Sequence, residues 1–189
     1  MSSVNTFKLF NIDFFRNLGL LTKPSLLSPD NRAKNILELP RVLNSSDIRA
    51  VIFDLDQTIL PYGEKTVAPD IIDVLNHIKD NYSCCILSNI PRNEEAKRRL
   101  ESVEAQTGIK SLSPTKKKPD PESFRLALDF LGENPRNTVM VGDRLFTDIM
   151  GANDLGIITI LVSPIDWKSD PLIMVTLPRI IEKIILFFI

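Results

Sequence analysis

Residues 51–58 read Val-Ile-Phe-Asp-Leu-Asp-Gln-Thr, an apolar run that ends in two aspartates one residue apart, followed by a threonine. The β-branched and aromatic residues of the run predict a buried strand. Successive strand side chains point to opposite faces, so we expect Asp54 and Asp56 to project in the same direction beyond the strand, while Leu55 turns back into the core. The stretch therefore predicts two carboxylates, each with its own chemical task, at the end of a strand.

The composition favours one catalytic domain with extensions. The chain has 189 residues, of which 43% are hydrophobic, enough for one sizeable core and too few for two full α/β domains. Lys and Arg number 23 against 24 Asp and Glu, so the net charge of −1 offers no global field for nucleic acid, and we expect no nucleic-acid partner. Cys84 and Cys85 are adjacent in an apolar run, which predicts strand thiols in a reducing compartment and neither a disulfide framework nor a zinc site.

The sequence also bears on the compartment. No apolar run approaches the roughly 20 residues needed to cross a bilayer, and the N-terminus lacks the uninterrupted apolar core of a secretory signal. We therefore expect a protein of the cytoplasm or of an organelle interior.

From Arg49 onward, β-branched runs alternate with amphipathic stretches, which predicts an α/β fold with parallel strands and crossover helices. The expected strands are 49–54, 83–88, 137–142, 157–162 and a shorter 109–112, and the expected helices are 69–80, 92–106, 120–131 and 145–155. Residues 49–165 form the expected catalytic domain. Residues 1–48 are expected to be a partly amphipathic arm, and residues 166–189 a loop and an amphipathic helix that docks either on a membrane or on the domain's own core.

Three further groups of polar residues follow predicted strands or precede a predicted helix. Ser88 and Asn89 come after the second strand, where Ser88 can present a hydroxyl to a phosphate oxygen. Lys118 precedes Pro119, which fixes the backbone ahead of a helix, whereas Lys116 and Lys117 are expected to be solvated. The stretch Gly142-Asp143-Arg144-Leu145-Phe146-Thr147-Asp148 places one aspartate at a strand end and another in the next helix. Asp54 and Asp143 together predict a site for a hard cation such as Mg²⁺.

The four groups, Asp54 to Thr58, Ser88, Lys118-Pro119 and Gly142 to Asp148, resemble the motif set of the haloacid dehalogenase (HAD) superfamily of phosphatases. The resemblance covers residues 49–162. It implies a Rossmann-like parallel sheet of order 3-2-1-4-5 with helices on both faces. It also implies a magnesium-dependent phosphatase that forms an aspartyl phosphate.

The resemblance assigns a role to each motif residue. Asp54 is the expected nucleophile, and Asp56 the expected acid that protonates the leaving oxygen and then the base that activates water. Magnesium is expected on the Asp54 and Asp143 carboxylates and on the main-chain carbonyl of Asp56. The expected phosphate-binding residues are Ser88, Asn89, Lys118 and Thr58, and Asp148 is expected to orient Lys118 or metal-bound water. The only histidine, His77, is expected on the solvated face of its helix.

The motif spacing bears on the substrate. Only 33 residues separate Asp54 from Ser88 and only 29 separate Ser88 from Lys118, so neither gap can hold a large cap domain. Superfamily members without caps tend to act on large substrates, or on small ones when an oligomer covers the site.

Residues 142–149, 151–153, 155–156 and 159–162 make the resemblance more specific. They look like the corresponding residues of a subgroup of subfamily IIIA, the subgroup that contains phosphatidylglycerophosphate phosphatases. This implies hydrolysis of phosphatidylglycerophosphate to phosphatidylglycerol by a peripheral enzyme at an anionic membrane surface. The alternatives are a phosphatase of a soluble phosphomonoester, such as a sugar phosphate or a nucleotide, and a non-catalytic adaptor.

Overall fold

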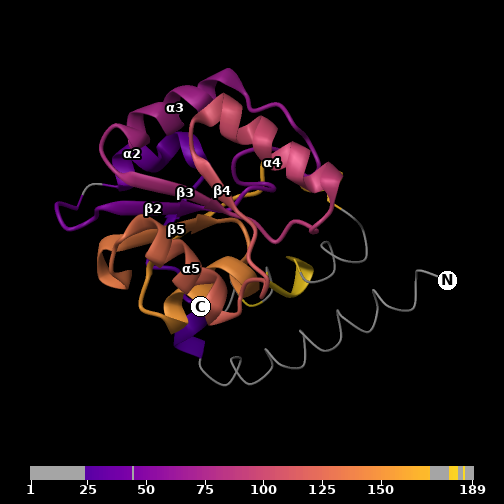
Figure 1. Ribbon diagram of the computed structural model, residues 1–189. Coiled ribbons are helices and arrows are strands. Elements are labelled where there is room, and N and C mark those ends of the chain that lie inside the picture. The colour runs from indigo at the N-terminus through magenta and orange to yellow at the C-terminus, as the bar shows by residue number, and fades with distance from the viewer. Residues whose placement is uncertain (1–23, 44, 171–178, 183–184, 186–189) are drawn as a thin grey trace.

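The computed structural model describes residues 24–43, 45–170, 179–182 and 185, and within them one parallel sheet has the strand order β1-β6-β5-β2-β3-β4 (Figure 1). The strands are β1 Asn31–Ala33, β2 Ala50–Phe53, β3 Ser83–Leu87, β4 Lys110–Leu112, β5 Thr138–Gly142 and β6 Ile158–Val162. The helices are α2 Leu39–Val42, α3 Pro69–Lys79, α4 Glu94–Thr107, α5 Pro121–Leu131 and α6 Met150–Asp154. Residues 1–23 of the predicted amphipathic arm lie outside the described part.

The predicted α/β fold is confirmed, with one correction to the strand order. The five predicted strands are β2 to β6, and their order agrees with 3-2-1-4-5 when β2 is counted as the first. A sixth strand, β1, adds to the edge, where Asn31 pairs with Ile160 and Ala33 with Val162. Sequence periodicity missed β1 because three residues are too few to show alternation.

Local signals in the sequence explain where the long helices begin and end. The side chain of Asn93 caps α4 by accepting a hydrogen bond from the Ala96 amide, and Gly108 ends the helix in the left-handed conformation. Pro69 opens α3 at a position where a missing amide costs nothing. The predicted helix 145–155 differs, because its first part, Leu145–Ile149, is a π-helical turn that leads into α6.

The core lies on both faces of the sheet. In β2, Val51 and Phe53 pack into a cluster with residues of α3 and α4, while Ile52 packs on the other face with Phe124 of α5. Figure 1 shows α2, α3 and α4 covering one face and α5 covering the other. The predicted strand thiol Cys85 is fully buried, and burial raises its pKa to about 12, so this thiol is unreactive at neutral pH.

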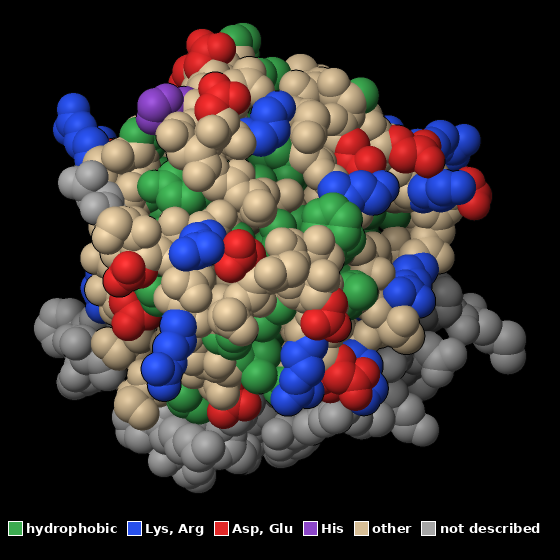
Figure 2. Space-filling view, turned by 60° about the vertical axis from the view of Figure 1, so that its left-hand side comes forward, with side chains coloured by type: hydrophobic (Ala, Val, Ile, Leu, Met, Phe, Trp, Pro, Cys, Tyr) green, Lys and Arg blue, Asp and Glu red, His purple; other side chains and the backbone are tan. Residues whose placement is uncertain are grey.

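The surface carries both signs of charge. Acidic and basic side chains are interspersed on the face shown in Figure 2, as the net charge of −1 leads one to expect. His77 is exposed, as predicted, and so are Lys116 and Lys117. Among the helices of the described residues, none has the length and apolar character needed to span a bilayer.

The connections between strands leave the sheet open at the carboxyl ends of its strands. Within residues 45–170, α3 is the only helix between β2 and β3, and α4 is the only helix between β3 and β4, so the predicted lack of a large cap is confirmed there. Strands β2 and β5 are neighbours, and the chain winds outward from them in both directions. In open α/β sheets, ligands bind at such a reversal point, beyond the carboxyl ends of the strands.

Candidate active site

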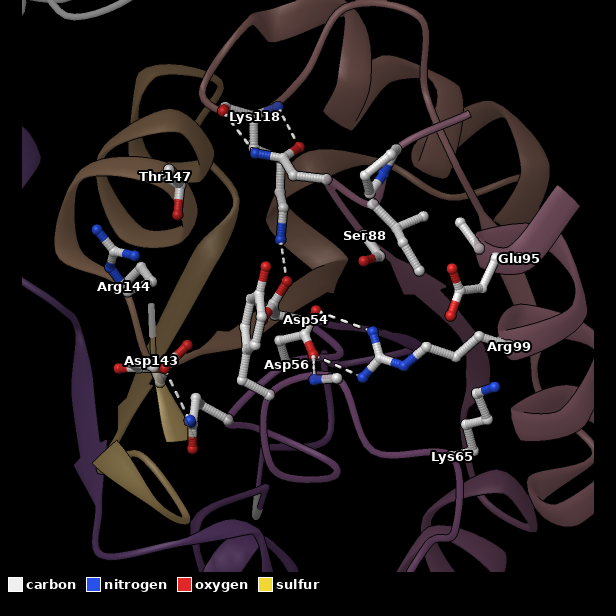
Figure 3. A pocket seen from close by; sticks show the side chains of 18 of the residues that line it. Asp54, Asp56, Lys65, Ser88, Glu95, Arg99, Lys118, Asp143, Arg144 and Thr147 are labelled. Atoms are coloured by element: carbon white, nitrogen blue, oxygen red, sulfur yellow. Dashed lines mark hydrogen bonds and ion pairs between the residues drawn. The ribbon is translucent and has the colours of Figure 1, made fainter. Parts of the chain in front are cut away.

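A cavity of about 350 Å³ lies at the carboxyl ends of the central strands (Figure 3). Its lining includes six of the eight predicted site residues: Asp54, Asp56, Ser88, Asn89, Lys118 and Asp143. Thr58 and Asp148 are also buried but do not line the cavity. The fold thus brings together residues that are up to 89 positions apart, from Asp54 to Asp143, while their chemical roles stay predictions.

Lys118 forms the centre of a buried charge cluster. Its ammonium group donates to Asp54 Oδ1 at 2.5 Å and to Asp148 Oδ1 at 2.7 Å, and its side chain is 1% exposed. Burial disfavours the charged form of Lys118, but Asp148 and Asp54 together raise its pKa above the ordinary value. The lysine is therefore a fixed cation next to Asp54.

Asp54 follows β2, and its amide donates to the Val141 carbonyl of the neighbouring strand β5 at 2.8 Å. Burial raises the pKa of Asp54 to about 7, opposed by the attraction of Lys118 and supported by the repulsion of Asp148. A carboxylate in this setting needs additional positive charge to ionise fully at neutral pH. A cation bound beside Asp54 would supply such charge.

Asp56 has a cationic partner of its own. Arg99 of α4 binds both Asp56 oxygens, with Nη2–Oδ1 at 2.6 Å and Nη1–Oδ2 at 3.1 Å, and the Gly63 amide donates to Oδ1 at 3.1 Å. Arg99 also donates through Nε to the Glu64 carbonyl at 2.7 Å. Sequence reasoning missed Arg99, although it follows buried Ala96 by three positions and so falls on the inward stripe of α4.

The remaining predicted phosphate-binding residues differ in how they are placed. Ser88 is buried and lines the cavity. The Asn89 side chain is engaged with the main chain of Lys118, accepting from its amide at 2.8 Å and donating to its carbonyl at 2.9 Å. The Thr58 hydroxyl is buried without a hydrogen-bond partner among the described residues. Asn89 therefore holds the Lys118 backbone in place, and its predicted phosphate contact stays a prediction.

Asp143 is paired with an arginine from the C-terminal segment. Arg179 Nη1 lies 2.5 Å from Asp143 Oδ2, and Arg179 Nε donates to Asp170 Oδ2 at 2.6 Å. Burial raises the pKa of Asp143 well above its ordinary value, and the Arg179 charge opposes that rise. This pairing could not be predicted, because 36 positions separate the two residues and they share no sequence pattern.

Three further hydrogen bonds hold the C-terminal part of the chain against the domain. Gln57, with φ of 67°, donates through Nε2 to the Asp166 carbonyl at 2.6 Å and to Asp170 Oδ1 at 2.8 Å. Glu182 accepts from Arg144 Nε at 3.2 Å. Residues 179–182 are helical, and their polar side chains dock on the domain itself.

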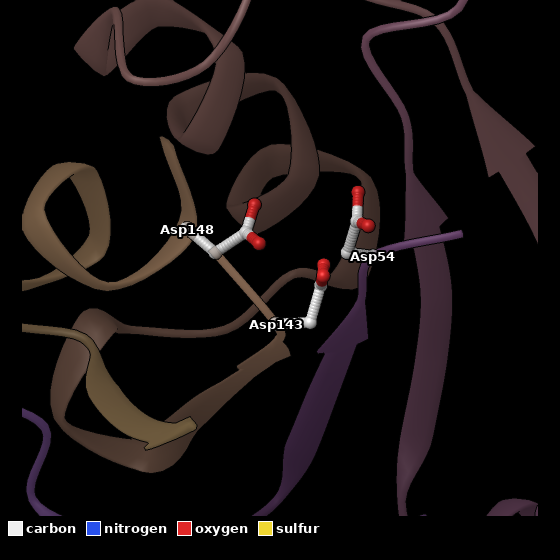
Figure 4. Close-up of side chains that lie close together, drawn as sticks. All are labelled: Asp54, Asp143 and Asp148. Atoms are coloured by element: carbon white, nitrogen blue, oxygen red, sulfur yellow. The ribbon is translucent and has the colours of Figure 1, made fainter. Parts of the chain in front are cut away.

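The acidic side chains fit a divalent cation. Asp54, Asp143 and Asp148 each offer a carboxylate oxygen, and these atoms lie within 4.8 Å of one another (Figure 4). Asp148 is engaged with Lys118 and with the Arg144 amide, whereas Asp143 Oδ1 is buried with no hydrogen-bond partner among the described residues. Oxygen donors of this kind suit Mg²⁺, and Asp54 and Asp143 are the residues placed to hold it.

Gly142 makes this arrangement possible. A Cβ atom at position 142 would stand 2.4 Å from Asp148 Oδ2 and 2.6 Å from Asp148 Cβ, closer than real Cβ contacts allow. Only glycine therefore lets Asp148 approach the end of β5 and reach Lys118.

Comparison with known proteins identifies the family. The family model described as mitochondrial PGP (phosphatidylglycerophosphate) phosphatase matches residues 15–166. The probable phosphatase YqeG of Bacillus subtilis is 30% identical over 72% of this chain and 77% of its own length. The mitochondrial phosphatidylglycerophosphatase GEP4 of Saccharomyces cerevisiae is 33% identical over 74% of this chain and 79% of its own.

A solved structure supports the same fold. The HAD phosphatase from Thermococcus onnurineus superposes with a TM-score of 0.53 at 19% identity, covering 66% of this chain and 89% of its own. This likeness shows that the chain shares the fold of that HAD phosphatase. The chain belongs to the mitochondrial PGP phosphatase family and is a phosphoric monoester hydrolase.

Proposed function

We propose that this protein is a magnesium-dependent phosphatase that removes the terminal phosphate of phosphatidylglycerophosphate at a membrane surface, through an aspartyl-phosphate intermediate. The observation that carries the chemical part is the meeting of Asp54, Lys118 and Asp143 in one cavity beyond the carboxyl ends of β2 and β5. A nucleophilic carboxylate, a fixed ammonium and a second carboxylate are the groups that phosphoryl transfer needs.

In the first step, an Asp54 oxygen attacks phosphorus in line, and the bond between phosphorus and the leaving alcohol oxygen breaks. Asp56 donates a proton to that oxygen. Ser88 and Lys118 hold the phosphoryl oxygens as charge builds on them. In the second step, Asp56 takes a proton from water, which attacks the same phosphorus and releases inorganic phosphate and the Asp54 carboxylate.

Asp54 and Asp143 would hold the cation, which would supply positive charge that offsets the repulsion between a phosphate dianion and the carboxylates. Burial raises the pKa of Asp54 to about 7, and the positive charge of a bound cation would favour the ionised, nucleophilic form of this carboxylate. Clustering buried acids in this way is unfavourable for folding, which argues against a pure adaptor.

The substrate proposal rests on the family and on the shape of the site. A relative named phosphatidylglycerophosphatase is 33% identical over most of both chains. A cavity of about 350 Å³ is at the small end of ligand sites, so it suits a phosphorylated headgroup and leaves acyl chains outside. We further propose that the protein works inside an organelle, because its relative GEP4 is a mitochondrial phosphatidylglycerophosphatase.

The test is phosphate release by the purified chain from phosphatidylglycerophosphate in vesicles, from sugar phosphates and from nucleotides, each with Mg²⁺ and with EDTA. We expect lipid-selective, Mg²⁺-dependent turnover that Asp54→Asn abolishes and Asp56→Asn slows. Acid-stable labelling of the Asp56→Asn protein by ³²P-substrate, absent in Asp54→Asn, would identify the intermediate. A preference for a soluble ester would exclude phosphatidylglycerophosphate as the main substrate. Full activity of Asp54→Asn would exclude Asp54 as the nucleophile.

A further inference from the structure

Large apolar side chains are exposed on chain segments that contribute residues to the cavity. The described residues contain eight exposed large hydrophobic side chains, and five of them belong to segments that line or border the cavity: Tyr62, Ile165, Trp167, Ile180 and Ile181. We call these five residues the apolar rim. Trp167 is 57% exposed and Ile180 is 50% exposed, so both leave apolar surface in contact with water.

Hydrogen bonds fix two members of the rim next to the catalytic loop. The Ile165 amide donates to the Gln57 carbonyl at 3.1 Å, and the Asp166 amide donates to Gln57 Oε1 at 2.8 Å. Trp167 follows directly, in the 3₁₀ turn Trp167–Ser169. Because Gln57 is the residue after Asp56, this turn holds Ile165 and Trp167 at the edge of the cavity.

The other members of the rim border the same cavity. Tyr62 is itself part of its lining. Ile180 and Ile181 follow Arg179, which lines the cavity and is bonded to Asp170 at the end of the Trp167 turn. The rim therefore consists of neighbouring segments tied to one another and is not a set of scattered surface residues.

Basic side chains accompany the rim. Lys168 is exposed next to Trp167, and Lys65, in the loop that carries Tyr62, is exposed and lines the cavity. Arg144 lines the cavity as well and is only partly buried. A tryptophan with isoleucines beside exposed lysines is a composition suited to the interface of an anionic bilayer, where apolar side chains enter the acyl boundary and cations meet phosphate groups.

We infer that the apolar rim is the membrane-docking surface of this protein, and that it seats the cavity directly on an anionic phospholipid bilayer. The inference deepens the proposed function, because a cavity that admits only a headgroup must open towards the bilayer that retains the acyl chains. The occupant of the rim is the bilayer itself, with Lys65 and Lys168 facing its anionic headgroups.

Trp167 provides a direct test, because it is the only tryptophan in the chain. Vesicles that contain phosphatidylglycerol should shift its fluorescence to shorter wavelength, and brominated acyl chains should quench it. In flotation assays, Trp167→Ser and Ile165→Ser should each lower the constant for partition of the protein onto vesicles by about tenfold. Phe130→Ser is the matched control: it removes an apolar side chain of α5 outside the rim whose exposure (49%) lies between those of Ile165 (38%) and Trp167 (57%), and it should leave binding unchanged.

Activity measurements separate this inference from the proposed function. The two rim variants should lose turnover of phosphatidylglycerophosphate in vesicles while keeping that of soluble p-nitrophenyl phosphate. Vesicle binding with no phosphatase activity on any ester would refute the proposed function but not the assignment of the rim as the membrane-docking surface. An unshifted Trp167 spectrum, equal loss of binding in Phe130→Ser, or concentration-dependent self-association through the rim without vesicle binding would overturn the assignment.

Discussion

Replacing Arg99 by glutamine is expected to separate phosphate esters by how much their leaving group needs a proton. Arg99 holds the Asp56 carboxylate by two hydrogen bonds, so its loss frees the proposed acid to rotate away from the leaving oxygen. The alkoxide of an alkyl phosphate is a poor leaving group and needs that proton, whereas p-nitrophenolate departs without it. Arg99 is in this sense a positioning residue that acts through Asp56.

The structure sets the size of the expected effects. General acid catalysis contributes roughly 10²–10⁴-fold, and a displacement of about 1 Å can remove about 10²-fold, so kcat/KM for an alkyl phosphate should fall by about 10². For p-nitrophenyl phosphate the loss should stay within about threefold. The Asp56 side chain is 24% exposed and can recruit water, so the free energy of unfolding should fall by about 1–3 kcal/mol, less than for a fully buried pair.

The assay compares kcat/KM for the two esters, because this quantity reports phosphoenzyme formation and not its hydrolysis. Arg98→Gln is the control, since Arg98 precedes Arg99 on α4 but is exposed. Arg99→Lys keeps the charge without the two-pronged contact and should fall between the wild type and Arg99→Gln. Equal losses on both esters would refute the positioning role and leave Arg99 with a purely structural one.

Three other perturbations follow from the charge cluster. Arg179→Gln removes the cation beside buried Asp143, so Tm without metal should fall while Mg²⁺ affinity, measured by calorimetry, rises by roughly tenfold; an unchanged affinity contradicts the competition. Asp54 has a pKa of about 7 when folded against 3.8 when unfolded, so metal-free stability should decline as pH rises between those values, and melts of Asp54→Asn should show a smaller decline, because Asp143, whose pKa burial also raises, remains. Gly142→Ala should push Asp148 aside and cost about 1–3 kcal/mol in urea unfolding; a neutral effect would mean that Asp148 can relax.

The fold was largely predictable because its signals are local. Apolar runs of four or five residues gave β2, β3, β5 and β6, and glycines such as Gly108 marked helix ends. Strand β1 escaped because its place depends on partners about 129 positions away, including a hydrogen bond from the Thr159 amide to Asp30 at 2.8 Å. No periodicity within three residues can encode such a pairing.

The residues of the site also fall into two groups, those that local sequence signals could predict and those that only packing decides. Asp54, Asp56, Lys118 and Asp143 were predictable because each stands at a fixed place relative to a strand end or a helix start, where parallel topology must deliver it to one edge. Their arginine partners come from a helix face and from the C-terminal segment, and which arginine reaches which carboxylate is decided by packing. Of these, only Arg99 left a trace, as a charged residue on the inward stripe of α4.

The pairing of acids and cations suggests how the site admits a metal ion. Lys118 and Arg99 belong to the core: Lys118 precedes α5 and is 1% exposed on its side chain, and Arg99 is anchored on α4 by the Glu64 carbonyl. Arg179 instead reaches Asp143 from beyond the six strands of the sheet. A divalent cation at Asp143 would add charge where Arg179 already sits, so we expect the two to compete for that carboxylate. A bound phosphate would offer Arg179, which lines the cavity, another counterion.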